Sequence, residues 1–106
     1  MLEKYCFQEV ECPEFIEGQN QFYVYLLNCS DGSLYCGSTS NLKERINKHN
    51  SGAAAIWTKN RLPAWLVYFE TYDTLLESRR REKQIKGWTT KKKMNLILGI
   101  WKKVSK

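Results

Sequence analysis

The chain has 106 residues, 42% of them hydrophobic and 26% charged, which predicts one globular domain and excludes a disordered or fibrous protein. Its apolar runs are too short to span a bilayer and its first residues lack the pattern of a secretion signal, so we expect no membrane partner. The net charge is +6, and residues 74–106 carry eleven basic and two acidic side chains. This basic end favours a polyanionic partner, nucleic acid first, and an ordinary solvated surface is the alternative.

The first twenty residues are acidic, with five glutamates and one lysine. They show no sustained periodicity, so we expect residues 1–20 to be an N-terminal extension and residues 21–106 to be a single domain. His49 is the only histidine and no Cys-x-x-Cys pair occurs, so a zinc site is not expected. We expect free thiols in a reducing compartment, which is the cytoplasm or, in a eukaryote, the nucleus. A Cys29–Cys36 pair across a hairpin is the alternative.

Residues 22–29 are apolar, aromatic and β-branched and predict a strand, which returns over residues 33–38 after a turn at Ser30–Gly32. A two-residue loop would place Tyr25 and Tyr35 on opposite faces of this hairpin, because side chains alternate along a strand. A three-residue loop ending in a left-handed glycine would place them on the same face. Since Gly32 occupies that third position, we expect the longer loop.

A capping box formed by Asn41 and Glu44 predicts a helix over about residues 41–51. The nearly continuous apolar run of residues 64–70 predicts a third strand, which we expect to be central in the sheet. Thr74 begins a helix over about residues 75–86, and a last helix begins after Thr89 or Thr90 and extends to about residue 100. The order β-β-α-β-α-α predicts an α+β fold, with a small, three-stranded, largely antiparallel sheet flanked by helices.

Glu82 is one of two acidic residues in the basic last third of the chain, between Arg81 and Lys83. On composition alone we favour ordinary ion pairs on a helix surface, which contribute little to stability. A carboxylate among cations is also what a hard divalent metal needs when it binds together with phosphate oxygens.

Two short motifs that contain tyrosine lie on the two predicted strands of the hairpin. Tyr23-Val24-Tyr25 is followed after nine residues by Tyr35-Cys36-Gly37, and the pair resembles the signature of the GIY-YIG nucleases. Arg45 and His49 follow at the spacing of the family's arginine and its tyrosine or histidine, and residues 77–86 resemble the helix with its metal-binding glutamate. Residues 28–35 and 57–68 are similar to the small stand-alone branch called URI-type. Tyr23 replaces the family's first glycine, and Ser38 stands where some members have a lysine.

The resemblance implies an endonuclease that hydrolyses phosphodiester bonds with one divalent metal, Mg²⁺ or Mn²⁺. Tyr35 would accept the proton of the attacking water, which requires nearby cations because phenols have a pKa of about 10 in water. Tyr25 would orient Tyr35 or the water, and Arg45 would bind the phosphate oxygens. Glu82 would hold the metal, and His49 would offer a second route for the proton because imidazoles titrate near neutrality. Asn95 is left unassigned.

The expected substrate is nucleic acid, with DNA favoured over RNA. A phosphate track would bind it without reading sequence, and the residues expected to form this track are basic: Lys59, Arg61, Arg79, Arg80, Lys86, Lys91, Lys92 and Lys93. Relatives often depend on an extra domain or subunit, so a targeting protein is a further expected partner. The alternative is a non-catalytic nucleic-acid-binding module that keeps the fold.

Overall fold

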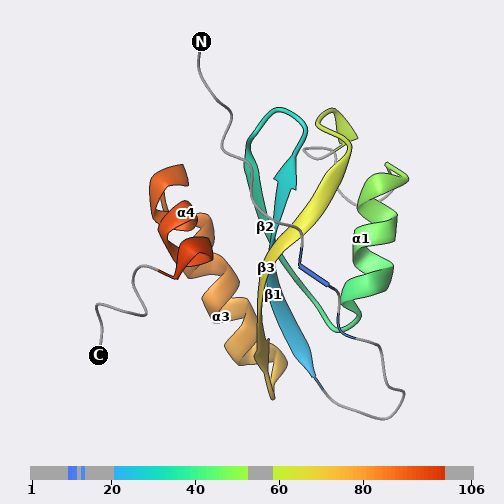
Figure 1. Ribbon diagram of the computed structural model, residues 1–106. Coiled ribbons are helices and arrows are strands. Elements are labelled where there is room, and N and C mark those ends of the chain that lie inside the picture. Colours follow the sequence, from blue (N-terminus) through green and yellow to red (C-terminus); the bar gives the residue numbers. More distant parts are fainter. Residues whose placement is uncertain (1–9, 12, 14–20, 53–58, 100–106) are drawn as a thin grey trace.

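Three antiparallel strands form one sheet in the computed structural model, which describes residues 10–11, 13, 21–52 and 59–99 (Figure 1). The strands are β1 (Phe22–Cys29), β2 (Leu34–Thr39) and β3 (Ala64–Tyr72), in the order β2-β1-β3. Three helices within these described ranges complete the element order β-β-α-β-α-α. The predicted α+β class, with a small antiparallel sheet and flanking helices, is confirmed.

The prediction that the third strand is central was wrong, because β1 lies between the other two strands. Seven of the eight residues of β1 are buried, which is the pattern of a strand covered on both faces and paired on both sides. β3 has its apolar run because its alternate residues pack on both faces, Leu66 on one and Val67 on the other. Its outer edge is also partly covered, since the Val10 amide donates to the Leu66 carbonyl at 2.8 Å.

Helices cover both faces of the sheet, with α1 (Leu42–Asn50) on one face and α3 (Leu75–Lys86) and α4 (Thr90–Leu98) on the other (Figure 1). Each begins at a side-chain cap: Asn41, Thr74 and Thr89 accept from the backbone amide three residues later. The two predicted capping boxes therefore start helices where expected. Within the described ranges, no helix has both the length and the apolar character needed to cross a bilayer.

The sheet has a separate apolar core on each face. Val24, Leu26 and Ile85 belong to the core under α3 and α4, whereas Leu27 and Leu42 belong to the core under α1. The two described cysteines divide between these cores, and both are buried free thiols: Cys36 lies on the α3 face and Cys29 on the α1 face. Of the two thiol expectations, free thiols are confirmed for this pair. Cys6 and Cys12 lie outside the described residues.

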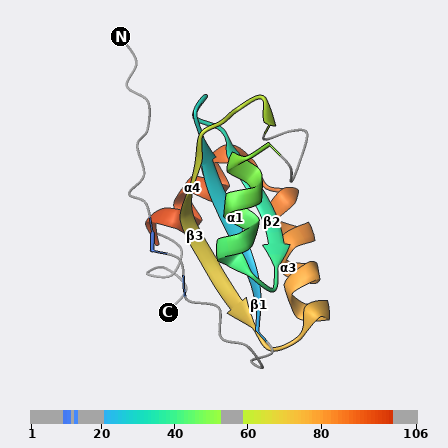
Figure 2. The ribbon, with the colours of Figure 1, turned by 90° about the vertical axis from the view of Figure 1, so that its right-hand side faces the viewer.

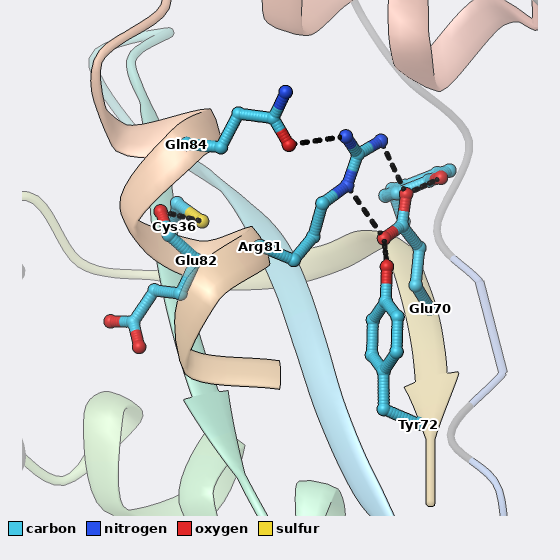
Figure 3. Close-up of polar contacts among 7 residues, drawn as sticks. Cys36, Glu70, Tyr72, Arg81, Glu82 and Gln84 are labelled. Carbon is cyan, nitrogen blue, oxygen red and sulfur yellow. Dashed lines mark hydrogen bonds and ion pairs between the residues drawn. The ribbon is translucent and has the colours of Figure 1, made fainter. Parts of the chain in front are cut away.

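A partly buried ionic cluster holds α3 against β3 (Figure 3). The Arg81 guanidinium donates to both carboxylate oxygens of Glu70, at 2.9 and 3.0 Å, and the hydroxyls of Tyr68 and Tyr72 donate to the same carboxylate. These bonds outweigh the cost of burial, which by itself raises the pKa of Glu70, and leave that pKa below its usual value. A bidentate, fully hydrogen-bonded pair is geometrically specific, so it sets the rotation of α3 on the sheet. Glu82 follows Arg81 and points to the other side of the helix (Figure 3).

Candidate active site at the edge of β2

The register of the hairpin brings the two motif tyrosines to one face of the sheet. Leu27 pairs with Tyr35 and Tyr25 pairs with Gly37, which is the arrangement expected from a three-residue loop. Gly32 has a φ of 88°, the left-handed conformation that this loop requires. The rings of Tyr25 and Tyr35 have their centroids 6.4 Å apart, on the α1 side of the sheet. The expectation of the longer loop and a shared face is confirmed.

Gly37 is required by the position of Tyr25 rather than by its own backbone. A Cβ atom at residue 37 would lie 2.6 Å from Cζ of Tyr25 and would also overlap its hydroxyl oxygen. Tyr25 is fully buried, so its ring has no free space into which it can move. The glycine of the second motif therefore leaves room for the tyrosine of the first.

We expect Gly37→Ala to destabilise the protein by about 2–3 kcal/mol, because the added methyl overpacks a buried ring. Urea unfolding followed by circular dichroism measures this loss. Gly87→Ala is the matched control, since a Cβ atom there meets only backbone oxygens at 3.6 Å or more and should change stability by less than about 1 kcal/mol. Equal midpoints for the two variants would contradict the assigned packing.

His49 reaches the tyrosines from α1 and is 1% exposed. Its Nε2 and the Tyr25 hydroxyl share a hydrogen bond of 2.9 Å, and its ring centroid lies 5.1 Å from that of Tyr35. Burial lowers the pKa of His49 to about 4, and the nearby Arg45 charge acts in the same direction. The expectation that His49 titrates near neutrality was therefore wrong: the imidazole is neutral at pH 7, and its place is beside Tyr25.

Because the imidazole is buried, we expect the free energy of unfolding to decrease as the pH is lowered from 7 to 5. Because the pKa of His49 is about 4 in the folded protein and about 6.5 in an unfolded chain, the unfolded state binds the proton more readily between these values. The contribution is complete above pH 6.5, and about 2 kcal/mol of it is lost between pH 7 and pH 5. His49→Gln should remove this part of the pH dependence, measured by urea unfolding at both pH values. A wild-type stability that stays constant over this range would contradict the prediction.

Tyr25 is a hydrogen-bonding group rather than an acid or base. Burial raises the pKa of its phenol far above the ordinary value, and the nearby Tyr35 adds to the rise. The hydroxyl therefore stays protonated and fixes the His49 ring at the buried end of the site. The sequence expectation was that Tyr25 orients Tyr35 or the attacking water, whereas the hydrogen bond of its hydroxyl shown here is to His49.

Glu82 comes from α3, on the opposite face of the sheet, and reaches the site around the edge of β2. Figure 2 shows α3 beside β2, and within the described part of the chain β2 pairs only with β1. The Ser38 hydroxyl donates to Glu82 Oε1 at 2.6 Å, and Lys86 Nζ lies 2.8 Å from Oε2. Burial alone would raise the pKa of Glu82, but the bonds from Lys86 and Ser38 outweigh it and lower the pKa. The carboxylate is therefore charged at neutral pH.

A cavity of about 540 Å³ joins the two sides of this edge. Arg45 from α1 and Glu82 from α3 both line it, so a guanidinium and a carboxylate from opposite faces meet there. Its other lining residues are Ser38, Arg79, Lys83 and Lys86. A second cavity of about 300 Å³ shares Ser38, Arg45 and Arg79 with the first and continues the groove. One acidic and four basic side chains make the main cavity suited to an anionic ligand.

The contact between Ser38 and Glu82 is the feature that sequence reasoning missed. In the sequence, Ser38 was notable only because it stands where some family members have a lysine. Its distance along the chain from Glu82 did not predict the contact, because tertiary packing brings the two residues together. Lys83, which also lines the cavity, was not among the expected contacts. It lies one helical position beyond Glu82, and this adjacency was the only available signal.

The basic residues expected to contact nucleic acid are distributed unevenly around the cavity. Arg79 and Lys86 line it, and Lys86 and Lys93 line a neighbouring cavity of about 310 Å³ beside Tyr35. Arg61 instead pairs with Asp31 at the hairpin turn, with Nε 3.1 Å from Oδ2. Lys92 stacks on the Trp88 ring. The remaining three are exposed: Lys59, Arg80 and Lys91.

The residues present fit one hard divalent cation. Among the described residues, no group of three or more His, Cys, Asp or Glu side chains could hold a metal, and Glu82 is the one acid lining the main cavity. Mg²⁺ typically keeps several waters and binds through one or two carboxylates together with substrate phosphates, and carboxylate and water ligands also suit Mn²⁺. A single carboxylate in a basic cavity of this size matches that donor set.

The fold and this edge site define a known class of domain. A family model described as the GIY-YIG catalytic domain matches residues 21–95, so the chain belongs to the GIY-YIG family, whose members are generally endonucleases. The match includes both hairpin motifs, α1 and Glu82. The resemblance predicted from the sequence is confirmed.

Similar proteins carry the name UPF0213, a small stand-alone GIY-YIG family. The UPF0213 protein of Staphylococcus aureus (strain Mu3 / ATCC 700698) is 48% identical over 75 residues, covering 71% of this chain and 92% of that protein. The solution NMR structure of EF2693 from E. faecalis is 31% identical, with a TM-score of 0.55, and the match covers 80% of this chain and 91% of that one. The structure of the UPF0213 protein BH0048 from Bacillus halodurans is 39% identical, with a TM-score of 0.48, and covers 73% and 82%.

Proposed function

We propose that this protein is a metal-dependent endonuclease that hydrolyses the phosphodiester bonds of nucleic acid, and of DNA rather than RNA. The observation that carries the proposal is the cavity at the edge of β2, where Arg45 and Glu82 from opposite faces of the sheet line one space. A phosphodiester resists hydrolysis because its anionic oxygens repel the nucleophile and its alkoxide leaves poorly. Cations and a proton acceptor around one point address both barriers.

Each candidate residue then has one role. The Arg45 guanidinium binds the non-bridging oxygens of the scissile phosphate with its planar fork. Tyr35 accepts the proton of the attacking water, and Tyr25 and His49 hold the position of its ring. Glu82 holds Mg²⁺ or Mn²⁺, which when bound supplies charge stabilisation to the phosphate and the leaving oxygen.

The contacts around Tyr35 support its assignment as the base. Its ring lies between the neutral His49 ring, at 5.1 Å, and the Lys86 ammonium, 5.8 Å from the ring centroid. It is partly exposed, whereas Tyr25 is fully buried. Of the two phenols, Tyr35 is therefore the one that a solvent water can approach.

Nucleic acid would lie along the groove by contacts to phosphate. Arg79, Lys86 and Lys93 line its cavities, and such contacts give affinity that falls with salt and does not depend on sequence. We propose that a separate protein directs the enzyme to its substrate and that the enzyme acts in the cytoplasm, or in the nucleus of a eukaryote. Arg61 is assigned to the hairpin turn rather than to this track.

The proposal is tested with the purified protein and labelled nucleic acids. Duplex, flap, junction and single-stranded DNA, and the matching RNAs, are incubated with Mg²⁺, with Mn²⁺ or with EDTA. We expect cleavage of at least one DNA only when metal is present. Binding without cleavage under every metal condition would instead identify a non-catalytic nucleic-acid-binding module that keeps the fold.

A further inference from the structure

Lys86 contacts both parts of the proposed catalytic machinery. Its Nζ lies 2.8 Å from Glu82 Oε2 and 5.8 Å above the centre of the Tyr35 ring. It also lines both the Arg45–Glu82 cavity and the smaller cavity beside Tyr35. The side chain therefore borders both cavities, and its ammonium occupies one of the two Glu82 oxygens that could bind a metal.

The side chain of Lys86 can move while its backbone stays in place. The Glu70–Arg81 cluster fixes α3 on the sheet, and the Cys36 thiol donates to the Glu82 carbonyl, at 3.9 Å, on the opposite side of the helix. The Lys86 side chain is 49% exposed, and a lysine ammonium is carried by a flexible four-carbon stem. An ion pair this exposed is weak, so a divalent cation can displace it.

We propose that Lys86 is an exchangeable cation: its ammonium holds Glu82 before metal binds, and the metal displaces it toward Tyr35 and the substrate phosphate. This inference rests on the proposed function and concerns how the metal-binding carboxylate is held before the metal binds. Before metal binds, the Lys86 ammonium neutralises the partly buried carboxylate of Glu82. After its displacement, the ammonium stabilises negative charge that develops on the phenol and the phosphate.

Two consequences of this exchange have opposite signs. Lys86 competes with metal for one oxygen, so removing its charge should tighten metal binding. The same charge acts on Tyr35 during the reaction, so removing it should slow cleavage when metal is saturating. If Lys86 were an ordinary surface lysine, removing its charge would neither tighten metal binding nor slow cleavage.

The experiment compares Lys86→Met with Lys83→Met in the full chain. Both changes keep an unbranched side chain and remove one charge from the same cavity. Lys86 contacts Glu82 and the Tyr35 ring, and Lys83 serves as the matched cavity-lining control. Mn²⁺ alone is titrated into each protein, and free Mn²⁺ is followed by electron paramagnetic resonance. We expect Lys86→Met to lower the Mn²⁺ dissociation constant about three- to tenfold, and Lys83→Met to lower it less than twofold. Cleavage of the labelled DNA at saturating Mn²⁺ should be about tenfold slower for Lys86→Met.

The outcomes separate this inference from the proposed function. If the wild type and Glu82→Gln bind Mn²⁺ equally, Glu82 is not the ligand and both proposals fail. If the wild type binds Mn²⁺ through Glu82 but Lys86→Met binds it no more tightly than Lys83→Met, the exchange alone is overturned. Tighter binding together with slower cleavage supports it, and tighter binding with unchanged cleavage would contradict the role of Lys86 after its displacement.

Discussion

Replacing Glu82 with glutamine is expected to lower metal-dependent cleavage by about a hundredfold or more, while binding of DNA changes by less than about threefold. Glutamine keeps the size of the side chain and can still accept a hydrogen bond from Ser38, which now donates to Oε1 at 2.6 Å. It removes the one negative charge that lines the main cavity. Because the basic residues around the cavity remain, the affinity for phosphates should be nearly unchanged.

The matched control for this change lies on the same helix. Glu77 is exposed and belongs to the capping box with Thr74, and glutamine serves equally at that position of a capping box. Glu77→Gln should therefore cleave at nearly the wild-type rate. Rates are measured over a titration of Mg²⁺ and of Mn²⁺, and binding is measured in Ca²⁺ by fluorescence anisotropy. Undiminished cleavage by Glu82→Gln at every metal concentration would remove Glu82 from the site.

The local features of this fold were predictable because they depend on neighbours in the chain. Gly32 allowed the three-residue loop, and the loop fixed which residues share a face, so the pairing of Leu27 with Tyr35 followed from the sequence. Asn41 and Thr74 marked the beginnings of their helices for the same reason, since a cap acts within three residues. Long-range order was less accessible. The apolar run of β3 suggested a central strand, yet apolar residues on both faces are also required of an edge strand that lies between two helical layers.

The sequence was enough to name the candidate residues of the site, but it did not show how they are arranged in space. Spacing matched Arg45 and His49 to the family's arginine and histidine. It could not show that His49 is buried against Tyr25 and that this burial lowers the pKa of His49 to about 4. It also could not show that Glu82 approaches from the other face of the sheet. That approach depends on α3 lying beside β2, and the contact with Ser38 spans 44 residues of sequence. Tertiary packing, rather than any local pattern, assembles the cavity.

Tyr35→Phe removes one oxygen atom and is expected to slow cleavage about 10²- to 10⁴-fold, the usual contribution of a general base. The phenylalanine ring can keep its packing against His49 and beneath Lys86, now at 5.1 and 5.8 Å. The circular dichroism spectrum and the urea midpoint should therefore stay close to the wild type, which separates a chemical effect from an unfolded hairpin.

Tyr23→Phe is the matched control, because it deletes a phenol oxygen from the same face of β1 at a position that packs on Phe69. That hydroxyl donates to Gln21 at 3.2 Å, and Tyr23 is not among the described residues that line the main cavity, so cleavage by Tyr23→Phe should be nearly unchanged. Single-turnover rates at saturating Mg²⁺ compare the two variants with the wild type. If Tyr35→Phe cut at the wild-type rate, the water would lose its proton by another route. The double variant with His49→Gln would then decide whether the imidazole accepts that proton.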